Sequence, residues 1–373
     1  MTGSANPMVL ADLSAELAAW FADAALPLWW ELGADHVNGG FHEALDDAAL
    51  PVPANRRARV QARQVYVYAM AGAFGWSGPW REAVAHGLNF FFARYRRPDG
   101  LYRTVVSPEG APVDEAAWLY DQAFALFAMA QAARALPAQR DALRVRAGDL
   151  LQALQSWRLD EGGFREPQAK YDRQSNPHMH LLEASLAWAE VDDDPAWAAL
   201  ADHIVALALG RFIDTNGALH EFFGPGWRFA EGLDGRIVEP GHQFEWAWLL
   251  ARWAKLRDDE PARAAAARLF AAGKRGIDGR GVATQQLLDD GSVHDAVARL
   301  WPQTERIKAA VIFGDNEEAA RAIAGLKLYL DRPVAGLWWD KLKPEGGFVQ
   351  EPAPASSFYH IACAIAELQA KKG

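Results

Sequence analysis

Gly39-Gly-Phe-His-Glu43 is the first of six short glycine-rich segments that recur along the chain. The others begin at intervals of 55 to 65 residues and are Gly100-Leu-Tyr-Arg103, Gly162-Gly-Phe-Arg-Glu166, Gly217-Ala-Leu-His-Glu221, Gly281-Val-Ala-Thr284 and Gly346-Gly-Phe-Val-Gln-Glu351. A steady period of this length is typical of a repeat architecture, in which each repeat is one supersecondary unit. The sequence therefore predicts six structural units.

Good helix formers and apolar residues at helical spacing fill the stretches between these segments. We expect twelve helices, two per unit, over residues 9–33, 57–75, 79–95, 114–135, 138–157, 177–191, 195–213, 238–257, 260–275, 299–313, 315–330 and 356–371. The last helix is rich in apolar residues, whereas the end of an open helical array needs a polar cap. We therefore predict an all-α fold in one domain over residues 1–373. It is a closed (α/α)6 toroid with an inner and an outer ring and short β connectors at one end.

Composition excludes several classes of function. The 373 residues carry a formal net charge of -10, which argues against nucleic acid or an anionic membrane surface as a partner. Charged residues interrupt every apolar run before it reaches the length of a bilayer-spanning helix. The single cysteine, Cys363, excludes an internal disulfide and fits a reducing compartment. Because Met1–Leu10 lacks a basic region followed by an apolar run, we expect no signal peptide and a cytoplasmic monomer or homodimer.

The stretch Glu239-Pro-Gly-His-Gln-Phe-Glu-Trp-Ala-Trp248 predicts the first turns of a helix, with Pro240 at the first helical position. His242 and Glu245 are three residues apart and therefore share a face of this helix. The partial positive charge of a helix N-terminus favours a developing negative charge, and a histidine with a carboxylate there suits proton transfer. Taken alone, however, the stretch is better explained as a capped helix with a packed aromatic face.

Five other helices that follow glycine-rich segments also begin with unusual polar residues. These are Arg59-Val-Gln-Ala-Arg63, Trp118-Leu-Tyr-Asp121, Asn176-Pro-His-Met-His180 with Glu183, Trp301-Pro-Gln-Thr-Glu305 with Lys308, and Ser356 to His360. All six clusters fall at the same phase of the repeat, so in a closed ring they converge at one mouth. A shared site explains this agreement better than six independent surface features.

Helical spacing sorts the histidines. His180 shares its face with Asn176 and Glu183 and is predicted to belong to the site, whereas His178 faces leucines and has a structural or rim role. His360 lies beside small residues that leave room for a ligand. The remaining histidines are less informative: His86 and His203 are expected to be ordinary outer-ring groups, His42 and His220 could reach the rim, and His36 and His294 have no supporting pattern.

Three chemistries are compatible with such a mouth. Zinc could use the imidazoles and carboxylates, but no metal-binding spacing such as His-Glu-x-x-His occurs, so we expect no metal and no cofactor. Glycoside hydrolysis needs two carboxylates but would leave the histidines without a role. Proton transfer at a carbon next to a carbonyl suits histidine, and Arg59 could hold the oxygen that becomes negative. The carboxylates available to any of these are Asp121, Glu183, Glu239, Glu245 and Glu305.

Six phrases in consistent order make the sequence resemble the N-acylglucosamine 2-epimerase family, which also contains mannose isomerases, sulfoquinovose isomerases and cellobiose epimerases. The phrases are Arg59-Val-Gln-Ala-Arg-Gln-Val-Tyr66, Trp118-Leu-Tyr-Asp-Gln-Ala-Phe124, Asn176-Pro-His-Met-His-Leu-Leu-Glu183, Glu239-Pro-Gly-His-Gln-Phe-Glu-Trp246, Arg299-Leu-Trp-Pro-Gln-Thr-Glu305 and Ser357-Phe-Tyr-His360. The resemblance implies the six-hairpin toroid and an acid/base pair at His242 and His360. It also implies ring opening by His180, Arg59 on the reacting oxygens, and Glu245 in support of His242.

The family's reactions share proton abstraction from C2 of an opened sugar. Arg59-Val-Gln61 and the compact chain resemble the mannose isomerase branch, so we expect an isomerase that interconverts D-mannose, or an aldose such as D-lyxose, and the ketose, D-fructose in the case of mannose. The alternatives are a 2-epimerase of N-acyl-D-glucosamine, mannose or cellobiose and, more distantly, a glycoside hydrolase or a sugar binder. The predicted substrate-binding residues are Arg59, Trp118, Asp121, Asn176, Glu183, Glu245, Trp301, Gln303 and Glu305.

Overall fold

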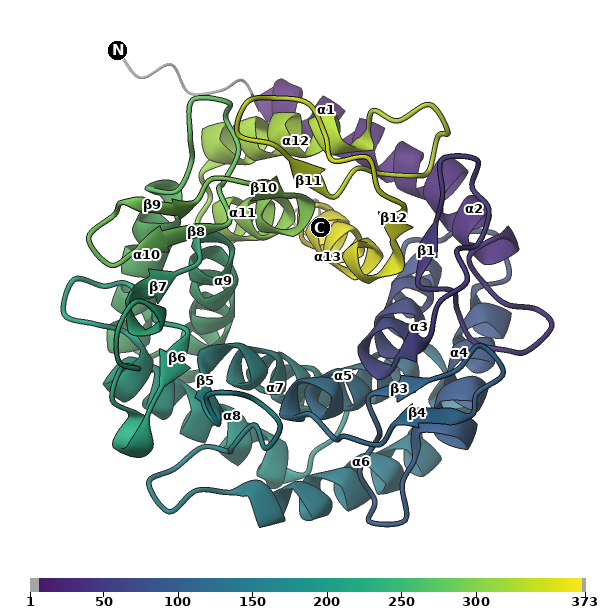
Figure 1. The fold of residues 1–373 in the computed structure, drawn as a ribbon, viewed down its shortest axis with the longest axis horizontal. Coiled ribbons are helices and arrows are strands. Elements are labelled where there is room, and N and C mark those ends of the chain that lie inside the picture. Colours follow the sequence, from purple (N-terminus) through teal and green to yellow (C-terminus); the bar gives the residue numbers. More distant parts are fainter. Residues whose placement is uncertain (1–6, 371–373) are drawn as a thin grey trace.

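Two concentric rings of helices make up the computed structural model, which describes residues 7–370 (Figure 1). Within these residues six helices form the inner ring: α3 (Ala58–Ala73), α5 (Leu119–Ala135), α7 (Ser175–Ala189), α9 (Pro240–Arg257), α11 (Leu300–Ile312) and α13 (Phe358–Ala370). These helices are buried over most of their length, because they pack on both neighbours and on the outer ring.

The outer ring surrounds them and alternates with them along the chain. Its first member is α1 (Pro7–Trp20), which continues through a π-helical turn into α2 (Leu26–Glu31). The other members are α4 (Trp80–Tyr95), α6 (Arg140–Leu154), α8 (Pro195–Leu207), α10 (Glu260–Lys274) and α12 (Asn316–Leu330). The twelve predicted helices are thus confirmed among the described residues, with α1, its turn and α2 forming the predicted helix 9–33.

The predicted helix boundaries differ from the structure at one notable place. The helix expected over 114–135 begins only at Leu119, because Pro112–Asp114 forms a strand instead. Two expectations concern residues outside the described range, namely the character of Met1–Asn6 and the extension of the last helix to Lys371. In the part of the chain that the structure describes, no helix combines the length and apolar character needed to cross a membrane.

Both the inner and the outer ring of helices are closed. Helix α13 packs against α11 and also against α3, the first inner helix, and α1 packs against α12 in the outer ring. Strand β1 (Ala44–Leu45) pairs antiparallel with β12 (Ala353–Pro354), which joins the first unit to the last. This arrangement confirms the predicted closed (α/α)6 toroid.

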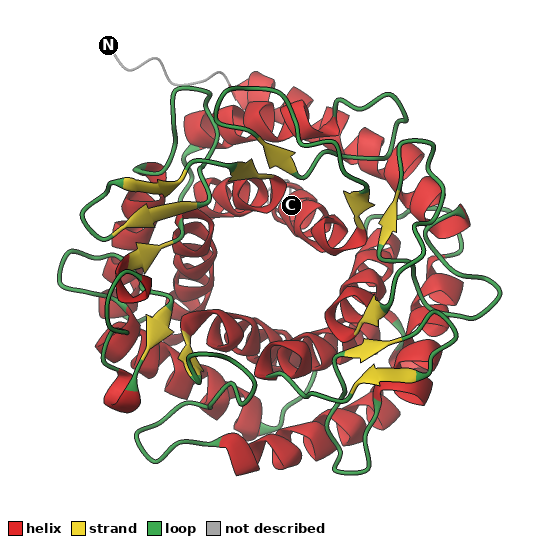
Figure 2. Cartoon of the chain, viewed as in Figure 1, coloured by secondary structure: helices red, strands yellow, loops and turns green. Residues whose placement is uncertain are grey.

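Short antiparallel strands lie on one end of the toroid (Figure 2). The strand before an inner helix pairs with a strand beside the next glycine-rich segment, so neighbouring units are joined. The partner strand follows that segment in three of the four pairs below, whereas β11 precedes Gly346. The pairs are β2 (Arg56–Arg57) with β3 (Val105–Val106), β5 (Arg173–Gln174) with β6 (Phe222–Phe223), β7 (Ile237–Val238) with β8 (Gln286–Leu288), and β10 (Ala298–Arg299) with β11 (Lys341–Leu342). Third strands β4 (Pro112–Asp114) and β9 (Val293–Asp295) extend two of these sheets. The connectors lead directly into the inner helices, whose N-termini therefore surround the opening at this end.

A polar side chain at the fourth position of five inner helices holds the preceding connector. The Gln61 amide donates to the Phe41 carbonyl and accepts from the Phe41 N–H, both at 2.8 Å. The φ of Gly40 is +73°, and a Cβ there would lie 2.7 Å from the Gln61 Oε1 atom, so the close approach needs glycine. The equivalent pairs are Gln122 with Tyr102, His178 with Phe164, Gln243 with Leu219 and Gln303 with Ala283.

Several histidines have structural roles of the same kind. His178 accepts from the Phe164 N–H through Nε2 at 2.9 Å, and its Nδ1 lies 2.8 Å from the Gln174 carbonyl oxygen, to which it donates. Burial lowers the pKa of His178 to about 4, in keeping with this neutral form. His86 and His203, expected to be ordinary outer-ring groups, are partly buried and bond to the connectors at Gly40 and Gly163.

Candidate active site

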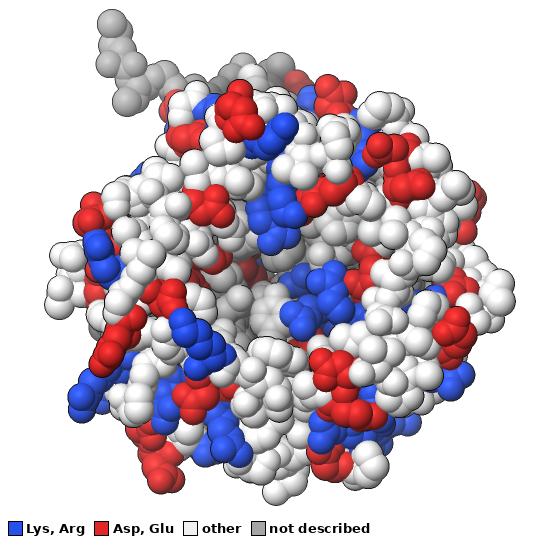
Figure 3. All heavy atoms as spheres, in the orientation of Figure 1, with Lys and Arg blue, Asp and Glu red and all other residues white. Residues whose placement is uncertain are grey.

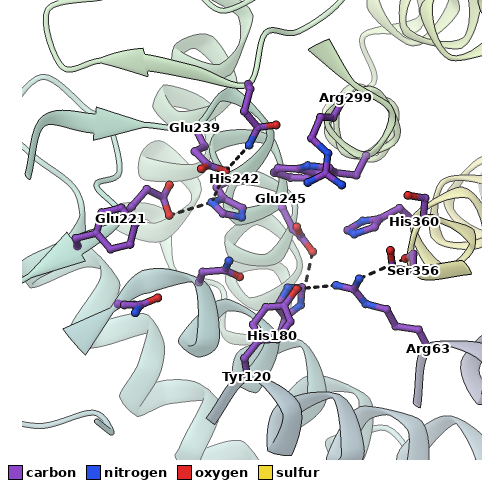
Figure 4. Close-up of a pocket in the computed structure, with 16 residues that line it drawn as sticks. Arg63, Tyr120, His180, Glu221, Glu239, His242, Glu245, Arg299, Ser356 and His360 are labelled. Carbon is purple, nitrogen blue, oxygen red and sulfur yellow. Dashed lines mark hydrogen bonds and ion pairs between the residues drawn. The ribbon is translucent and has the colours of Figure 1, made fainter. Parts of the chain in front are cut away.

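A cavity of about 300 Å³ lies within the ring of inner-helix N-termini. Figure 3 shows the opening as a hollow at the centre of this end of the molecule, with basic side chains on its edge. Inner helices contribute Arg63, Tyr120, Asn176, His180, His242, Glu245, Trp301 and His360, and the connectors and strands add Gln174, Glu221, Phe222, Glu239, Gln285, Arg299, Ser356 and Ser357. The six polar clusters of the sequence therefore converge. Three glutamates, three histidines and two arginines line this small volume (Figure 4).

The indole of Trp301 separates two histidines of the cavity. Its ring centroid lies 5.0 Å from that of His242 on α9 and 5.7 Å from that of His360 on α13. Trp301 itself is on α11, between these two helices in the ring. A sugar ring can stack on such a flat apolar surface, and the titratable imidazoles on either side can then reach its polar groups.

His242 is paired with two carboxylates. Its Nδ1 lies 2.9 Å from Glu221 Oε2 and 3.4 Å from Glu239 Oε2 (Figure 4). Burial alone would lower the pKa of His242, but the charges of Glu221 and Glu239 raise it to about 10. His242 is therefore an imidazolium at neutral pH, with Nδ1–H donating to Glu221 and Nε2–H left for a ligand.

His360 has the opposite electrostatic environment. Its Nδ1–H donates to Glu305 Oε1 at 2.8 Å. Burial lowers the pKa of His360 well below its usual range, and the positive charges of Arg63 and Lys308 lower it further. A neutral imidazole whose Nδ1 carries the proton keeps an unprotonated Nε2, so His360 is a base when His242 is an acid.

His180 is the third histidine of the cavity. Its Nδ1 lies 3.3 Å from Glu183 Oε2, and the Tyr359 hydroxyl donates to the same oxygen at 2.5 Å. The ring packs against Tyr120 and Phe124 at centroid distances of 5.0 and 4.3 Å. Burial lowers the pKa of His180 to about 4, although the hydrogen bond with Glu183 opposes the shift.

Arg63 is the buried guanidinium of the cavity. It donates to the Tyr120 hydroxyl at 2.6 Å and to the Ser356 carbonyl at 3.3 Å, and it lies 4.2 Å from the centroid of the Phe124 ring. Among residues 7–370 no carboxylate forms an ion pair with it. Its positive charge is therefore available to an anionic group in the cavity.

Arg59, which the sequence analysis placed on the reacting oxygens, lies outside the residues that line the cavity. Its Nε is 2.8 Å from Asp121 Oδ1, and Asp121 is fully buried. The two residues thus join α3 to α5 beside the mouth. Trp118 immediately precedes α5 and likewise does not line the cavity.

The family-model comparison gives a match to the N-acylglucosamine 2-epimerase (GlcNAc 2-epimerase) family over residues 39–364. The chain belongs to this family. A mannose-6-phosphate isomerase of Rhizobium meliloti (strain 1021) is 49% identical over 374 residues, which cover 95% of this chain and 96% of the relative. A D-mannose isomerase of Thermobifida fusca is 29% identical over 371 residues, 90% of each chain. These relatives and the family agree that the chain is an enzyme of the isomerase class that acts on sugars.

Solved structures of sugar epimerases and isomerases share the fold. The cellobiose 2-epimerase from Bacillus thermoamylovorans B4167 superposes with a TM-score of 0.86 at 17% identity, covering 96% of this chain and all of that one. A D-mannose isomerase superposes with a TM-score of 0.83 at 19% identity, covering 98% of each chain. At these identities the superpositions establish the toroid and leave the choice between isomerase and epimerase to the site.

Three predicted site residues lie behind the cavity wall rather than on it. Glu183 and Glu305 bond to His180 and His360 as described above, and both are buried. Gln303 differs from the prediction, because its amide is engaged by the Ala283 backbone, with both distances 2.9 Å. Its role in this structure is to hold a connector, although the residue falls inside the polar cluster of α11.

The support of His242 also differs from the expected one. The carboxylate that bonds its Nδ1 is Glu221, a connector residue to which the sequence analysis gave no role, and not Glu245. Glu245 lies one turn deeper, 3.9 Å from both His180 Nδ1 and Lys308 Nζ, and neither of its oxygens has a hydrogen-bond partner among the described residues. Burial raises the pKa of Glu245 well above its usual range, and the charge of Glu305 raises it further.

Two groups of residues have donor atoms close enough together to hold a metal ion. One is His180, Glu183 and Glu245, and the other is Glu245, Glu305 and His360. Lys308 stands beside both groups, with Nζ 2.5 Å from Glu305 Oε2 and 3.9 Å from Glu245 Oε1. The ammonium supplies the positive charge that these carboxyl groups would otherwise take from a cation.

Proposed function

We propose that the protein is an aldose–ketose isomerase that converts a mannose-configured aldose into the corresponding fructose-configured ketose. The observation that carries the proposal is the placement of His242 and His360 on the two sides of Trp301 with opposite charged neighbours. Glu221 and Glu239 lie beside His242, whereas the positive charges of Arg63 and Lys308 act on His360. Pairs of titratable groups whose environments separate their pKa values identify the acid and the base of a site. The reaction begins with an opened sugar, and we assign ring opening to His180, the other neutral imidazole of the cavity.

His360 is the base in this proposal. Its Nε2 removes the proton from C2 of the aldose and returns it to C1, an adjacent carbon on the same face. Because burial, Arg63 and Lys308 lower the pKa of His360, the ring is unprotonated at neutral pH and ready to accept. The orientation is fixed by the hydrogen bond from Nδ1–H to Glu305.

His242 supplies a proton to oxygen rather than to carbon. As an imidazolium held by Glu221 and Glu239, it donates Nε2–H to the carbonyl oxygen at C1 as the enediol forms. It takes a proton back from the hydroxyl at C2 as the ketone forms, so it ends the reaction as an imidazolium again. A C2 epimerase would need the two histidines to exchange roles, because the acid in one direction is the base in the other. A histidine whose pKa is about 10 is rarely free of its proton, which favours the isomerase.

Arg63 is the residue we assign to the negative oxygens. It is buried, has no carboxylate partner among the described residues, and borders the cavity between α3 and α13. A fixed guanidinium aimed at the site of developing charge stabilises the transition state without reorganisation. The inner-helix N-termini around the mouth add partial positive charge of the same sign.

Mannose configuration is supported by the relatives at 49% and 29% identity, whose names both contain mannose. The first of these names adds a 6-phosphate and the second does not. The isomerisation at C1 and C2 is the chemistry that the two share, so D-mannose and D-mannose 6-phosphate form two arms of one test. Arg299, a partly exposed lining residue, is the second guanidinium of the cavity wall, and one side of it is ion-paired with Asp340 at 2.9 Å. Its exposed side could bind a phosphate.

The test is to incubate the protein with each sugar in turn and to follow the products by NMR. We expect D-fructose or D-fructose 6-phosphate as the first product in one or both arms, with deuterium from solvent entering C1. A glucose-configured first product with deuterium at C2 and no ketose would show a 2-epimerase instead. Hydrolysis of mannosides without exchange, or binding without turnover, would reject both isomerase and epimerase.

A further inference from the structure

Lys308 is a buried cation directly beneath the cavity. Its side chain is fully buried on α11, and the residue is not among those that line the cavity. Nζ lies 2.5 Å from Glu305 Oε2, 3.9 Å from Glu245 Oε1 and 4.0 Å from the centroid of the Trp248 ring. The ammonium therefore touches carboxyl groups and an indole face, and it has no path to a sugar in the cavity.

A charged group in this position is not explained by packing. Removing an ammonium from water is unfavourable, and an uncharged side chain of similar volume often packs as well or better in its place. Burial would lower the pKa of Lys308, but the charges of Glu305 and Glu245 raise it above its usual value, so the ammonium persists. The charge itself must therefore be what the position requires.

The two oxygens of Glu305 connect this charge to the base of the reaction. Oε2 faces Lys308 Nζ, while Oε1 accepts the Nδ1–H of His360. We propose that Lys308 is a positioning residue that holds the Glu305 carboxylate in place through the ion pair and thereby keeps His360 in the tautomer whose Nε2 can accept a proton. The inference rests on the proposed function only in assigning His360 as the base.

Removing the charge of Lys308 would change the surroundings of Glu305. Glu305 is fully buried, and without the ammonium it would be a carboxylate with no cation beside it. Without the ion pair the Glu305 carboxyl is free to turn away from His360 Nδ1. The ring then loses the acceptor that keeps its proton on Nδ1, and a proton on Nε2 blocks the base. The ammonium also repels a proton on His360 directly. Both effects make Lys308 favour the neutral ring with a free Nε2.

Other charged and titratable groups face the pair and set the background for any pH effect. They come from each packed inner helix: Arg63 on α3, His180 and Glu183 on α7, Glu245 on α9, and Tyr359 and Cys363 on α13. None of them contacts both Lys308 and Glu305 within ion-pair distance among the described residues. Lys308 is therefore the group whose removal changes Glu305 most directly.

The principal test is Lys308→Met, which removes the charge and keeps much of the volume. We expect kcat to fall roughly 10- to 100-fold, part of the ~10²–10⁴ that a general base contributes, with a smaller change in KM. The acid limb of the pH profile should move to higher pH, because the pKa of His360 rises when the ammonium is lost. Nitrogen-15 NMR of the substrate-free protein should show His360 as the Nδ1–H tautomer in the wild type and a shift toward Nε2–H in the variant.

Arg306→Met is the matched control. Arg306 is also a buried cation on α11, bonded to Glu318 at 2.6 Å, but it faces the outer ring. This variant should lower stability without moving the pH profile or the His360 signals. If both variants change kcat and the profile equally, Lys308 has only a structural role and the proposal fails.

A second comparison covers the case in which Lys308→Met does not fold. Glu305→Gln alone and the double variant with Lys308→Met remove one or both charges of the pair. If Lys308 acts through Glu305, the double variant should have nearly the kcat and pH profile of Glu305→Gln. A further large loss in the double variant, or an Nε2–H signal for His360 in the wild type, would overturn the proposal. The NMR readout needs no substrate, so it is independent of which sugar is turned over.

Discussion

Glu221 Oε2 lies 2.9 Å from His242 Nδ1, so a carboxylate at the end of a connector fixes the protonation of a histidine in the first turn of α9. The same carboxyl accepts from the Ser175 hydroxyl at 3.2 Å, and its backbone carbonyl accepts from the Ser175 N–H at 3.1 Å at the start of α7. The connector thus ties two inner helices together and presents its last residue to the site. Structural and chemical roles coincide in one side chain.

Replacing this carboxylate should change the pH dependence of activity. In Glu221→Gln the amide can still hydrogen-bond to His242, but the charge that raises the pKa of His242 is gone. The pKa of His242 should fall, so the alkaline limb of the kcat profile moves to lower pH, and kcat at neutral pH falls by up to about 10²-fold. The measurement is the dependence of kcat on pH between pH 5 and 10 for the wild type and the variant. An unchanged alkaline limb would remove His242 as the acid.

The two principal histidines should each be indispensable. His242→Ala and His360→Ala are expected to lower kcat by about 10²–10⁴-fold, the usual contribution of a general acid or base, with the fold retained by circular dichroism. His86→Ala is the control, because His86 lies on the outer helix α4, bonds to the Gly40 carbonyl and does not line the cavity. A comparable loss in His86→Ala would mean that the site lies elsewhere.

The two arginines of α3 offer a direct contrast. Arg63→Met should lower kcat by about 10²–10³-fold, the loss typical of one missing oxyanion donor, because no other buried guanidinium in the described structure faces the cavity. Arg59→Met leaves Asp121 unpaired and should act mainly on stability. Steady-state kinetics together with thermal denaturation separate the two effects. The reverse ranking of kcat values would restore Arg59 to the reacting oxygens.

The sequence analysis predicted the closed toroid because the repeat is visible in local patterns. Glycine-rich segments, helical spacing and an apolar last helix are each readable within a few residues, and closure follows from their number and regularity. The three histidines of the cavity could be found for the same reason. His180, His242 and His360 each lie within the first two turns of an inner helix, and all three line the cavity.

Local sequence patterns could not predict how deeply a side chain lies in the structure, or which residues from distant parts of the chain contact it. Arg59 and Arg63 are four residues apart and share a helical face, so spacing does not reveal that Asp121 holds the first while the second reaches the cavity. Glu245 shares a face with His242 but lies a turn deeper, next to Lys308. Glu221 reaches His242 only because of the path of its connector. The role of Gln303 could have been predicted from the sequence. Glutamine occupies the fourth position of four inner helices, and this repetition indicates a repeated contact with the backbone.

Chelation should leave turnover unchanged. Lys308 lies 2.5 Å from Glu305 and 3.9 Å from Glu245, so the carboxyl cluster under the cavity already has a cation supplied by the chain. Prolonged treatment with a strong chelator, followed by metal analysis of the protein, is the measurement. Loss of activity that zinc or manganese restores would show instead that one of the two His–Glu groups around Glu245 holds a metal ion in the working enzyme.

Gln303→Leu should lower stability and leave catalysis nearly intact. The Gln303 amide bonds to both the N–H and the carbonyl of Ala283, and the substitution leaves these buried backbone groups without partners, at a cost of about 1–3 kcal/mol. The midpoint of thermal denaturation should fall by several degrees, while kcat and KM measured well below it stay within a factor of about 3. Gln350→Leu, at an exposed glutamine, is the matched control and should change neither the midpoint of thermal denaturation nor the kinetic constants. A rise in KM without a change in the midpoint would place Gln303 in the sugar site after all, as the sequence alone predicts.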